Sequence, residues 1–289
     1  MTKRTFFLGL SALLLWSFSE ARAQGQSSKE LIRKEFTLTG SAGRSVLALY
    51  NVNGSVTVRG YAGSQVLVEA TKTIAAPTAS ALEAGRREAR LGFVQRGDSV
   101  VVYLAGPHDS RPHTGPSRYQ NQREPRYRYT FDFVVKVPYQ LNLHISTVNH
   151  GAVLVQDVAG ALAVFNVNGA IALRNVRGTT EACTVNGNVE ASYAASPPGA
   201  SSYHTINGQI KVKYPASLAA DLHFKSMHGE LYTDFPNVEP LPVRVTKNQA
   251  NQGDGTVYTL TKDTAVRVGR GGPALHFETL NGDVTVARQ

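Results

Sequence analysis

The chain has 289 residues, of which 30 are Lys or Arg and 21 are Asp or Glu, so its formal net charge is +9. Its single cysteine, Cys183, excludes an intramolecular disulfide, so stability must come from packing and backbone pairing. The length allows one large or two ordinary domains, and the positive charge favours anionic polymers or lipids as partners without specifying a fold.

The N-terminus has the pattern of a secretory signal peptide. Lys3 and Arg4 precede an apolar run over 6–18, and Ala21-Arg22-Ala23 supplies a small-x-small cleavage motif. As a helix the run would span about 20 Å, short of the roughly 30 Å core of a bilayer, and no later stretch is long and apolar enough to cross one. The sequence therefore predicts a signal peptide over 1–23, cleavage between Ala23 and Gln24, a single β-repeat domain over 24–289, and export to the periplasm, the cell surface or the medium.

The first third of the predicted domain is expected to consist of strands around one helix. Apolar residues alternate with polar ones between 35 and 73, which is typical of strands with one buried face. Segment 78–91 has mixed charged and apolar residues after Pro77, a residue that suits a first helical turn. A strand pair is expected around Gly97-Asp98.

Segment 106–128 is rich in proline, arginine and tyrosine and almost free of aliphatic residues, which predicts an exposed insertion. Arginine binds phosphates and carboxylates as a fork, and tyrosine rings stack on sugars. A candidate binding surface is therefore formed by Arg118, Tyr119, Arg123, Arg126, Tyr127 and Arg128. Nucleic acid is not expected as a partner of an exported protein, so the candidate partners are an anionic glycan, lipopolysaccharide or an envelope protein. The alternative is a solvated loop without a function.

A tetrapeptide of the type Asn/Thr-x-Asn-Gly recurs along the chain and is followed by apolar residues at every second position. This period of two indicates strands with one buried face. Between 151 and 187 the glycines are spaced every nine residues, so two strands fit in each unit of eighteen. The glycines predicted to form the corners are Gly54, Gly151, Gly160, Gly169, Gly178, Gly187, Gly208, Gly229 and Gly282.

Two architectures are consistent with this repeat. Asn-Gly between alternating strands is a strong β-hairpin signal, which would give an antiparallel meander. Identical corners at identical spacing favour instead a stack in which each coil lies in register on the next. The sequence therefore predicts an all-β fold: a right- or left-handed parallel β-solenoid, β-helix-like, of nine-residue half-coils, with one short helix near its N-terminal end. The repeated asparagines are expected to form amide ladders, and a second insertion is expected over 235–254.

No catalytic or metal-binding group is predicted. Calcium in repeated β-rolls needs carboxylates at the corners, and these corners offer Asn, His, Ala and Arg. The histidines have no cysteine or carboxylate pair to complete a metal set, and Cys183 has no matching His and acid, so a packed thiol is expected. We therefore expect no cofactor, no metal and no enzymatic activity.

Several segments resemble the bacterial "putative adhesin" family, an exported β-strand-repeat domain of unknown function. They include 53–58 with 66–72, then 135–138 before the Asn-Gly coils, and the closing 278–284. The resemblance implies a β-helix-like fold in an exported protein, and the insertion at 106–128 departs from the family pattern. Three functions remain open: an adhesive or structural scaffold of the cell envelope, a periplasmic binding or sensing module for an anionic ligand, and an enzyme acting on polysaccharide.

Overall fold

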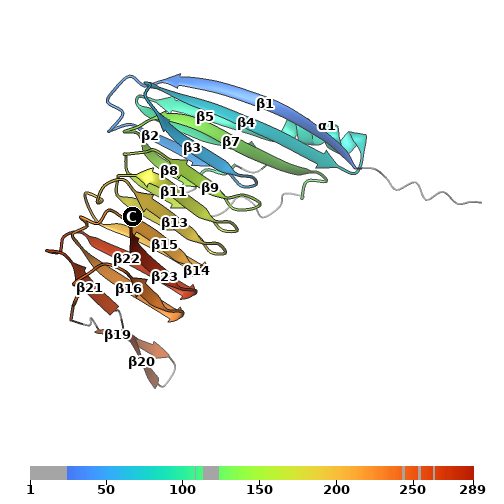
Figure 1. Ribbon diagram of the computed structural model, residues 1–289. Helices are drawn as coiled ribbons and strands as arrows, with labels where there is room; N and C mark the ends of the chain where they lie inside the picture. The colour runs from blue at the N-terminus through green and yellow to red at the C-terminus, as the bar shows by residue number, and fades with distance from the viewer. Residues whose placement is uncertain (1–24, 108, 113–123, 243–244, 253–254, 263) are drawn as a thin grey trace, which may run out of the picture.

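The computed structural model describes residues 25–107, 109–112, 124–242, 245–252, 255–262 and 264–289, and of the two segments between 245 and 262 it describes the backbone alone. The predicted signal peptide, the Ala23–Gln24 cleavage site and Arg118, Tyr119 and Arg123 lie outside these residues. The described chain is all-β with one short helix, α1 (Ala79–Glu88), as the sequence predicts. Its strands form two large open sheets and one separate hairpin (Figure 1).

The first sheet, here called sheet A, has ten strands. In spatial order they are β1 (Gln26–Thr37), β4 (Gln65–Ala76), β7 (Arg128–Pro138), β3 (Val56–Tyr61), β9 (Val153–Gln156), β11 (Ile171–Val176), β13 (Val189–Tyr193), β15 (Ile210–Tyr214), β23 (Val284–Arg288) and β17 (Leu231–Thr233).

The second sheet, sheet B, has eleven strands. In spatial order they are β18 (Glu239–Pro240), β21 (Thr264–Val268), β16 (Ala220–His228), β22 (Ala274–Asn281), β14 (Ser201–Asn207), β12 (Thr180–Cys183), β10 (Leu162–Phe165), β8 (Asn142–Ser146), β2 (Val46–Tyr50), β6 (Ser99–Gly106) and β5 (Arg90–Arg96). The hairpin consists of β19 (Val245–Gln252) and β20 (Gly255–Lys262).

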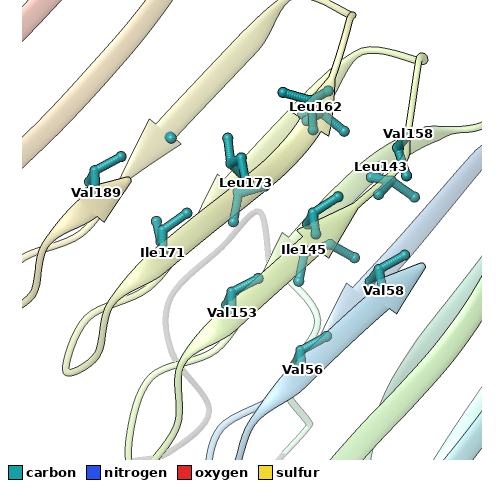
Figure 2. Packing of buried hydrophobic residues seen from close by; sticks show 14 of the residues in the cluster. Val56, Val58, Leu143, Ile145, Val153, Val158, Leu162, Ile171, Leu173 and Val189 are labelled. Carbon is teal, nitrogen blue, oxygen red and sulfur yellow. The ribbon is translucent and has the colours of Figure 1, made fainter. Parts of the chain in front are cut away.

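Successive strands of the repeat alternate between the two sheets, and each pairs in parallel with the strand one unit along. Val153, Ile171 and Val189 are register partners at intervals of eighteen residues, and Val56 and Ile210 extend the same row. All five are fully buried between the sheets, and Figure 2 shows four of them within the core. Burial of each such side chain stabilises the fold by about 1.5–3 kcal/mol. The parallel pairing excludes the antiparallel meander for this part of the chain.

Two columns of glycines lie at the corners. One column consists, in spatial order, of Gly54, Gly151, Gly169, Gly187, Gly208, Gly282 and Gly229. The other contains Gly160 followed by Gly178. A Cβ on Gly187 would lie 2.3 Å from the carbonyl oxygen of Gly169, and one on Gly178 would lie 1.9 Å from that of Gly160. Within these columns only Gly54 and Gly282 have a positive φ, of 117° and 148°. Close backbone approach between coils, rather than a hairpin conformation, is what selects glycine at most corners.

Polar side chains beside the glycines form two ladders. Buried Thr184, Thr205 and Thr279 each donate a hydrogen bond to the glycine carbonyl of the neighbouring coil, over 2.9, 2.8 and 3.0 Å. On the exposed side of the corner, amide–amide bonds of 2.8–2.9 Å link Asn149, Asn168, Asn186, Asn207 and Asn281 in sequence. The amide ladder expected from the sequence is therefore present, and its hydrogen bonds link the corners of successive coils.

The expectation of uniformly parallel sheets is wrong at both ends of the stack, where the sheets are mixed. β1, β4 and β7 pair antiparallel, as do β5 and β6, and at the other end β21 pairs antiparallel with β16 and β18. These segments lack the Asn-Gly corner, and the link between β5 and β6 is a tight turn in which Gly97 has φ 56°. The outermost strand β1 carries exposed Lys29, Glu30, Arg33 and Lys34, charges that discourage further edge pairing.

The order of the coils in space differs from their order in sequence at both ends. β2 and β3 lie between β6–β7 and β8–β9, so the connection from β7 to β8 passes over an earlier coil. The C-terminal strands β22 and β23 lie between β14–β15 and β16–β17. The final segment of the chain therefore fills an interior layer rather than closing the end of the stack.

The helix and the two expected insertions differ in extent from the prediction. Thr78 caps α1 by accepting from the Ala81 amide, and the helix ends at Glu88 because 90–96 pairs as β5. Buried Lys72 donates to the Arg86 carbonyl at the C-terminal end of the helix, over 2.8 Å. The predicted insertion 106–128 lies between β6, which extends to Gly106, and β7, which begins at Arg128. The predicted insertion 235–254 is part of a longer interruption of the repeat, which contains β18 to β21.

Candidate ligand-binding face

The outer face of sheet B carries two parallel rows of side chains that the strand register sets side by side. One row runs Ala48, His144, Ala163, Glu181, Ser202 and His276. The neighbouring row runs Tyr103, Tyr50, Ser146, Phe165, Cys183, His204 and Glu278. Because alternate residues of each strand point outward, every coil contributes one residue to each row.

Three rings lie side by side on this face, tilted by 53° and 41° from one to the next, and are here called the platform. His144 lies between Tyr50 and Phe165, with ring centroids 5.3 Å from each. Burial lowers the pKa of His144, and the nearby Glu181 carboxylate opposes this shift only in part. Burial also raises the pKa of Tyr50. The platform is therefore electrically neutral near neutral pH, with flat apolar ring faces and a few polar edges.

A shallow groove of about 620 Å³ runs beside the platform across six strands, from β2 to β22. Small apolar side chains line part of it, among them Ala161, Ala163 and Ala200. Hydrogen-bonding groups in its lining are supplied by Asn142, His144, Thr179, Glu181, Ser202 and His276. A groove that combines apolar surface with spaced polar groups has the composition of a ligand-binding surface rather than of a featureless sheet.

Outside the groove lining, on β14, β22 and β16, lies a set of charged side chains that are already paired. Lys225 bonds to the Glu278 carboxylate over 2.5 Å, and His204 Nδ1 lies 3.9 Å from the same group. Burial raises the pKa of the Cys183 thiol, so the protonated thiol predominates and the residue is a poor nucleophile. The two acids of this part of the face, Glu181 on β12 and Glu278 on β22, are separated by β14.

Of the six candidate residues in the predicted basic insertion, the structure describes three, and only two of these are exposed. Arg126 and Arg128 are exposed, and Arg128 is the first residue of β7. Tyr127 is only 5% exposed, donates to Glu88 over 2.8 Å and packs near Gly85. Burial, followed by the Glu88 interaction, raises its pKa above the usual range for tyrosine. Tyr127 thus stabilises the contact with α1 and is not available for stacking on a surface ligand.

The start of the insertion is anchored beside Tyr103 and Tyr50, at the β6 end of the second row. Ser110 donates to the Tyr50 carbonyl over 2.7 Å and accepts from the Leu104 amide over 2.8 Å. The Arg111 guanidinium lies 4.1 Å from the centroid of the Tyr103 ring, beside Tyr50 in the register. The insertion therefore meets the platform at Tyr50 on β2.

Sequence reasoning identified the insertion but missed Tyr50, His144 and Phe165 as a group. They come from three strands that are far apart in the chain, and only the parallel register brings them together. A weak signal was available, since Phe165 and Cys183 are eighteen residues apart and therefore occupy the same outward slot of successive coils. Tyr50 could not be placed this way because 62–138 separates its coil from β8.

Among the described residues, no group of three or more His, Cys, Asp or Glu side chains is arranged to hold a metal ion. Of the helices in this part of the chain, none has the length and hydropathy needed to cross a bilayer.

Comparisons with known proteins found structural neighbours. No family model and no curated protein matches the sequence. A "putative cell adhesion protein" from Clostridium sporogenes aligns over 91% of this chain and 100% of its own, with 9% identity and a TM-score of 0.46. A "putative adhesin" from Bacteroides fragilis aligns over 91% and 98%, with 11% identity and a TM-score of 0.36. A "putative lipid binding protein" from Parabacteroides distasonis aligns over 90% and 96%, with 11% identity and a TM-score of 0.38. The names of the first two agree with the resemblance drawn from the Asn-Gly repeat.

Proposed function

We propose that this protein is an exported, non-catalytic β-solenoid scaffold of the bacterial envelope that binds glycans on the outer face of sheet B. Parallel pairing at intervals of eighteen residues supports the solenoid, with the antiparallel strands at each end as its caps. The signal-like segment 1–23 supports export. The observation that carries the binding role is the neutral platform of Tyr50, His144 and Phe165 beside the groove.

The chemistry of the groove favours a sugar over the other partners considered, lipopolysaccharide phosphate and an envelope protein. Pyranose rings have one face of C–H groups that packs on flat aromatic rings, and hydroxyls around the rim that pair with amides, hydroxyls and carboxylates. The platform supplies the first kind of surface, and Asn142, Glu181 and Ser202 supply the second. The groove crosses several strands, so it has the length for more than one sugar unit.

The test is binding of the predicted mature chain, residues 24–289, to an array of bacterial and host glycans, followed by titration of the best neutral glycan. We expect Phe165→Ala to weaken that binding at least tenfold, because it removes one of the three rings of the platform. Leu154→Ala, which truncates a half-buried residue on the outer face of sheet A, is the matched control and should bind like the wild type.

Two results would contradict the proposal. One is that no neutral glycan binds to the wild-type chain. The other is that Phe165→Ala, shown by circular dichroism to be folded, binds as tightly as the wild type, which would place any glycan site elsewhere.

A further inference from the structure

A row of basic side chains crosses the outer face of sheet A, on the opposite side of the molecule from the groove. Arg59 on β3 is the register partner of Lys136 on β7 and of Gln156 on β9. Gln156 in turn is the partner of Arg174 on β11, and Ser192 on β13 is the partner of Lys213 on β15. We call Lys136, Arg59, Arg174 and Lys213 the basic stripe.

The stripe is exposed and its charges are not neutralised within the described protein. All four side chains are exposed, and none forms an ion pair with a described acid. Lys211 adds a fifth positive charge in the adjacent row, opposite Glu190. A common hollow of about 270 Å³ is lined by Arg174, Lys211 and Lys213 together with Ser192 and the single acid Glu190, so positive charge predominates there. Unpaired cations gathered on one face attract a polyanion more strongly than scattered surface charges do.

The spacing of the stripe is set by the backbone. Neighbouring strands lie about 4.8 Å apart, so Arg59, Arg174 and Lys213, on every second strand, are separated by about 9.6 Å each. The intervening strands contribute the neutral hydrogen-bonding residues Gln156 and Ser192. The face therefore repeats a cation and a neutral polar group at a period close to the length of an extended disaccharide.

We propose that the basic stripe is a second binding site, and that its ligand is a linear anionic polysaccharide in which acidic and neutral sugars alternate. The polymer lies across the strands, with its acidic groups on Arg59, Arg174 and Lys213 and its neutral sugars on Gln156 and Ser192. This site does not depend on the groove of sheet B, which has a neutral platform and faces the other way.

The experiment measures binding of the mature chain to hyaluronate, whose acidic and neutral sugars alternate, with dextran as the uncharged polymer. We expect the affinity for hyaluronate to fall as salt is raised, and the affinity for dextran to be insensitive to salt. Arg174→Glu with Lys213→Glu should weaken hyaluronate binding at least tenfold. Lys29→Glu with Arg96→Glu makes the same change in net charge at exposed positions outside the stripe, and should change it less than twofold.

The outcomes separate this site from the groove and from other polyanion ligands. Phe165→Ala should leave hyaluronate binding unchanged, and the stripe variant should leave binding of a neutral glycan unchanged. Equal weakening by both charge variants would overturn the proposal, because net charge alone would then explain binding. It would also be overturned if hyaluronate did not bind, or if anionic lipid vesicles or double-stranded DNA required the stripe while hyaluronate did not.

Discussion

A chain of hydroxyl groups lies inside the otherwise apolar core. Tyr193, Tyr203 and Tyr214 are fully buried, and Tyr203 bonds to Tyr193 over 2.6 Å and to Tyr214 over 3.0 Å. Tyr193 donates onward to Thr180. Since Tyr203 donates to Tyr193, the remaining bond must be donated by Tyr214. Each hydroxyl thereby has a partner, which buried polar groups require.

Tyr203→Phe is expected to destabilise the protein by about 1–3 kcal/mol, because it leaves the Tyr214 donor and the Tyr193 acceptor unpaired without changing the shape of the core. Denaturant unfolding would measure the change. Tyr139→Phe, at a tyrosine that is 46% exposed, is the control and should be neutral. A Tyr203→Phe variant as stable as the wild type would mean that the hydroxyl chain contributes nothing to stability.

His144 predicts a pH dependence of stability. Its pKa is lowered in the folded protein, so in acid below about pH 6.5 the unfolded chain binds a proton that the folded chain does not. The neutral, half-buried His144 therefore costs no stability above the pKa of the unfolded chain. As pH falls from that value toward the pKa of the folded chain, the free energy of unfolding decreases. The free energy of unfolding should decrease between pH 7 and pH 5 by more in the wild type than in His144→Gln. Identical pH profiles would contradict this assignment.

At the scale of the element, the corner is the unit that the repeat preserves. Three residues recur from coil to coil: a glycine, an exposed asparagine and a buried threonine that donates to the glycine carbonyl of the neighbouring coil. The glycines and asparagines contact their counterparts in the neighbouring coil, and the threonine contacts that coil's glycine. The repeat is thus a set of contacts between layers, which explains why its spacing is stricter than a hairpin would need.

Gly187→Ala should destabilise the protein by about 1–3 kcal/mol, since the added Cβ would overlap the Gly169 carbonyl and the coils would have to separate. Gly43→Ala is the control, because a Cβ there meets only the Ser41 hydroxyl, at 3.9 Å. Thermal unfolding of both variants would measure the difference. Similar melting temperatures would show that the corner tolerates a methyl group.

The same element explains how far the sequence could predict the structure. Strands, inward rows, corner glycines and the amide ladder all follow from local spacing, so the repeat revealed them. The antiparallel ends do not follow from local spacing. Apolar and polar residues alternate in β4 and β7 as in any half-buried strand, and this pattern does not reveal the direction in which the two strands pair. The platform of Tyr50, His144 and Phe165 was missed for the related reason that its first member comes from a coil placed out of order.

At the scale of the whole molecule, the out-of-order coils predict which parts of the chain are dispensable. Deleting 274–289 removes β22 and β23 from between β14–β15 and β16–β17, so an interior layer is lost. We expect this truncation to abolish cooperative thermal unfolding. Deleting 245–262 removes only the hairpin β19–β20, which pairs with neither large sheet, and should leave the melting temperature nearly unchanged. A cooperative transition in the first variant would show that β16–β17 can pack directly on β14–β15.

The position of β22 and β23 also bears on the order in which the protein is made. A ribosome, or a secretion channel, releases the N-terminal coils first, and these can stack as they emerge because each adds to a layer that is already present. β16 and β17 emerge before the strands on which they rest, and they have no complete neighbour until the last residues follow. A chain interrupted near its end would therefore expose two unfinished edges in the middle of the stack. This part of the stack is complete only when residues 274–289 have been released, because they form the layer between β14–β15 and β16–β17.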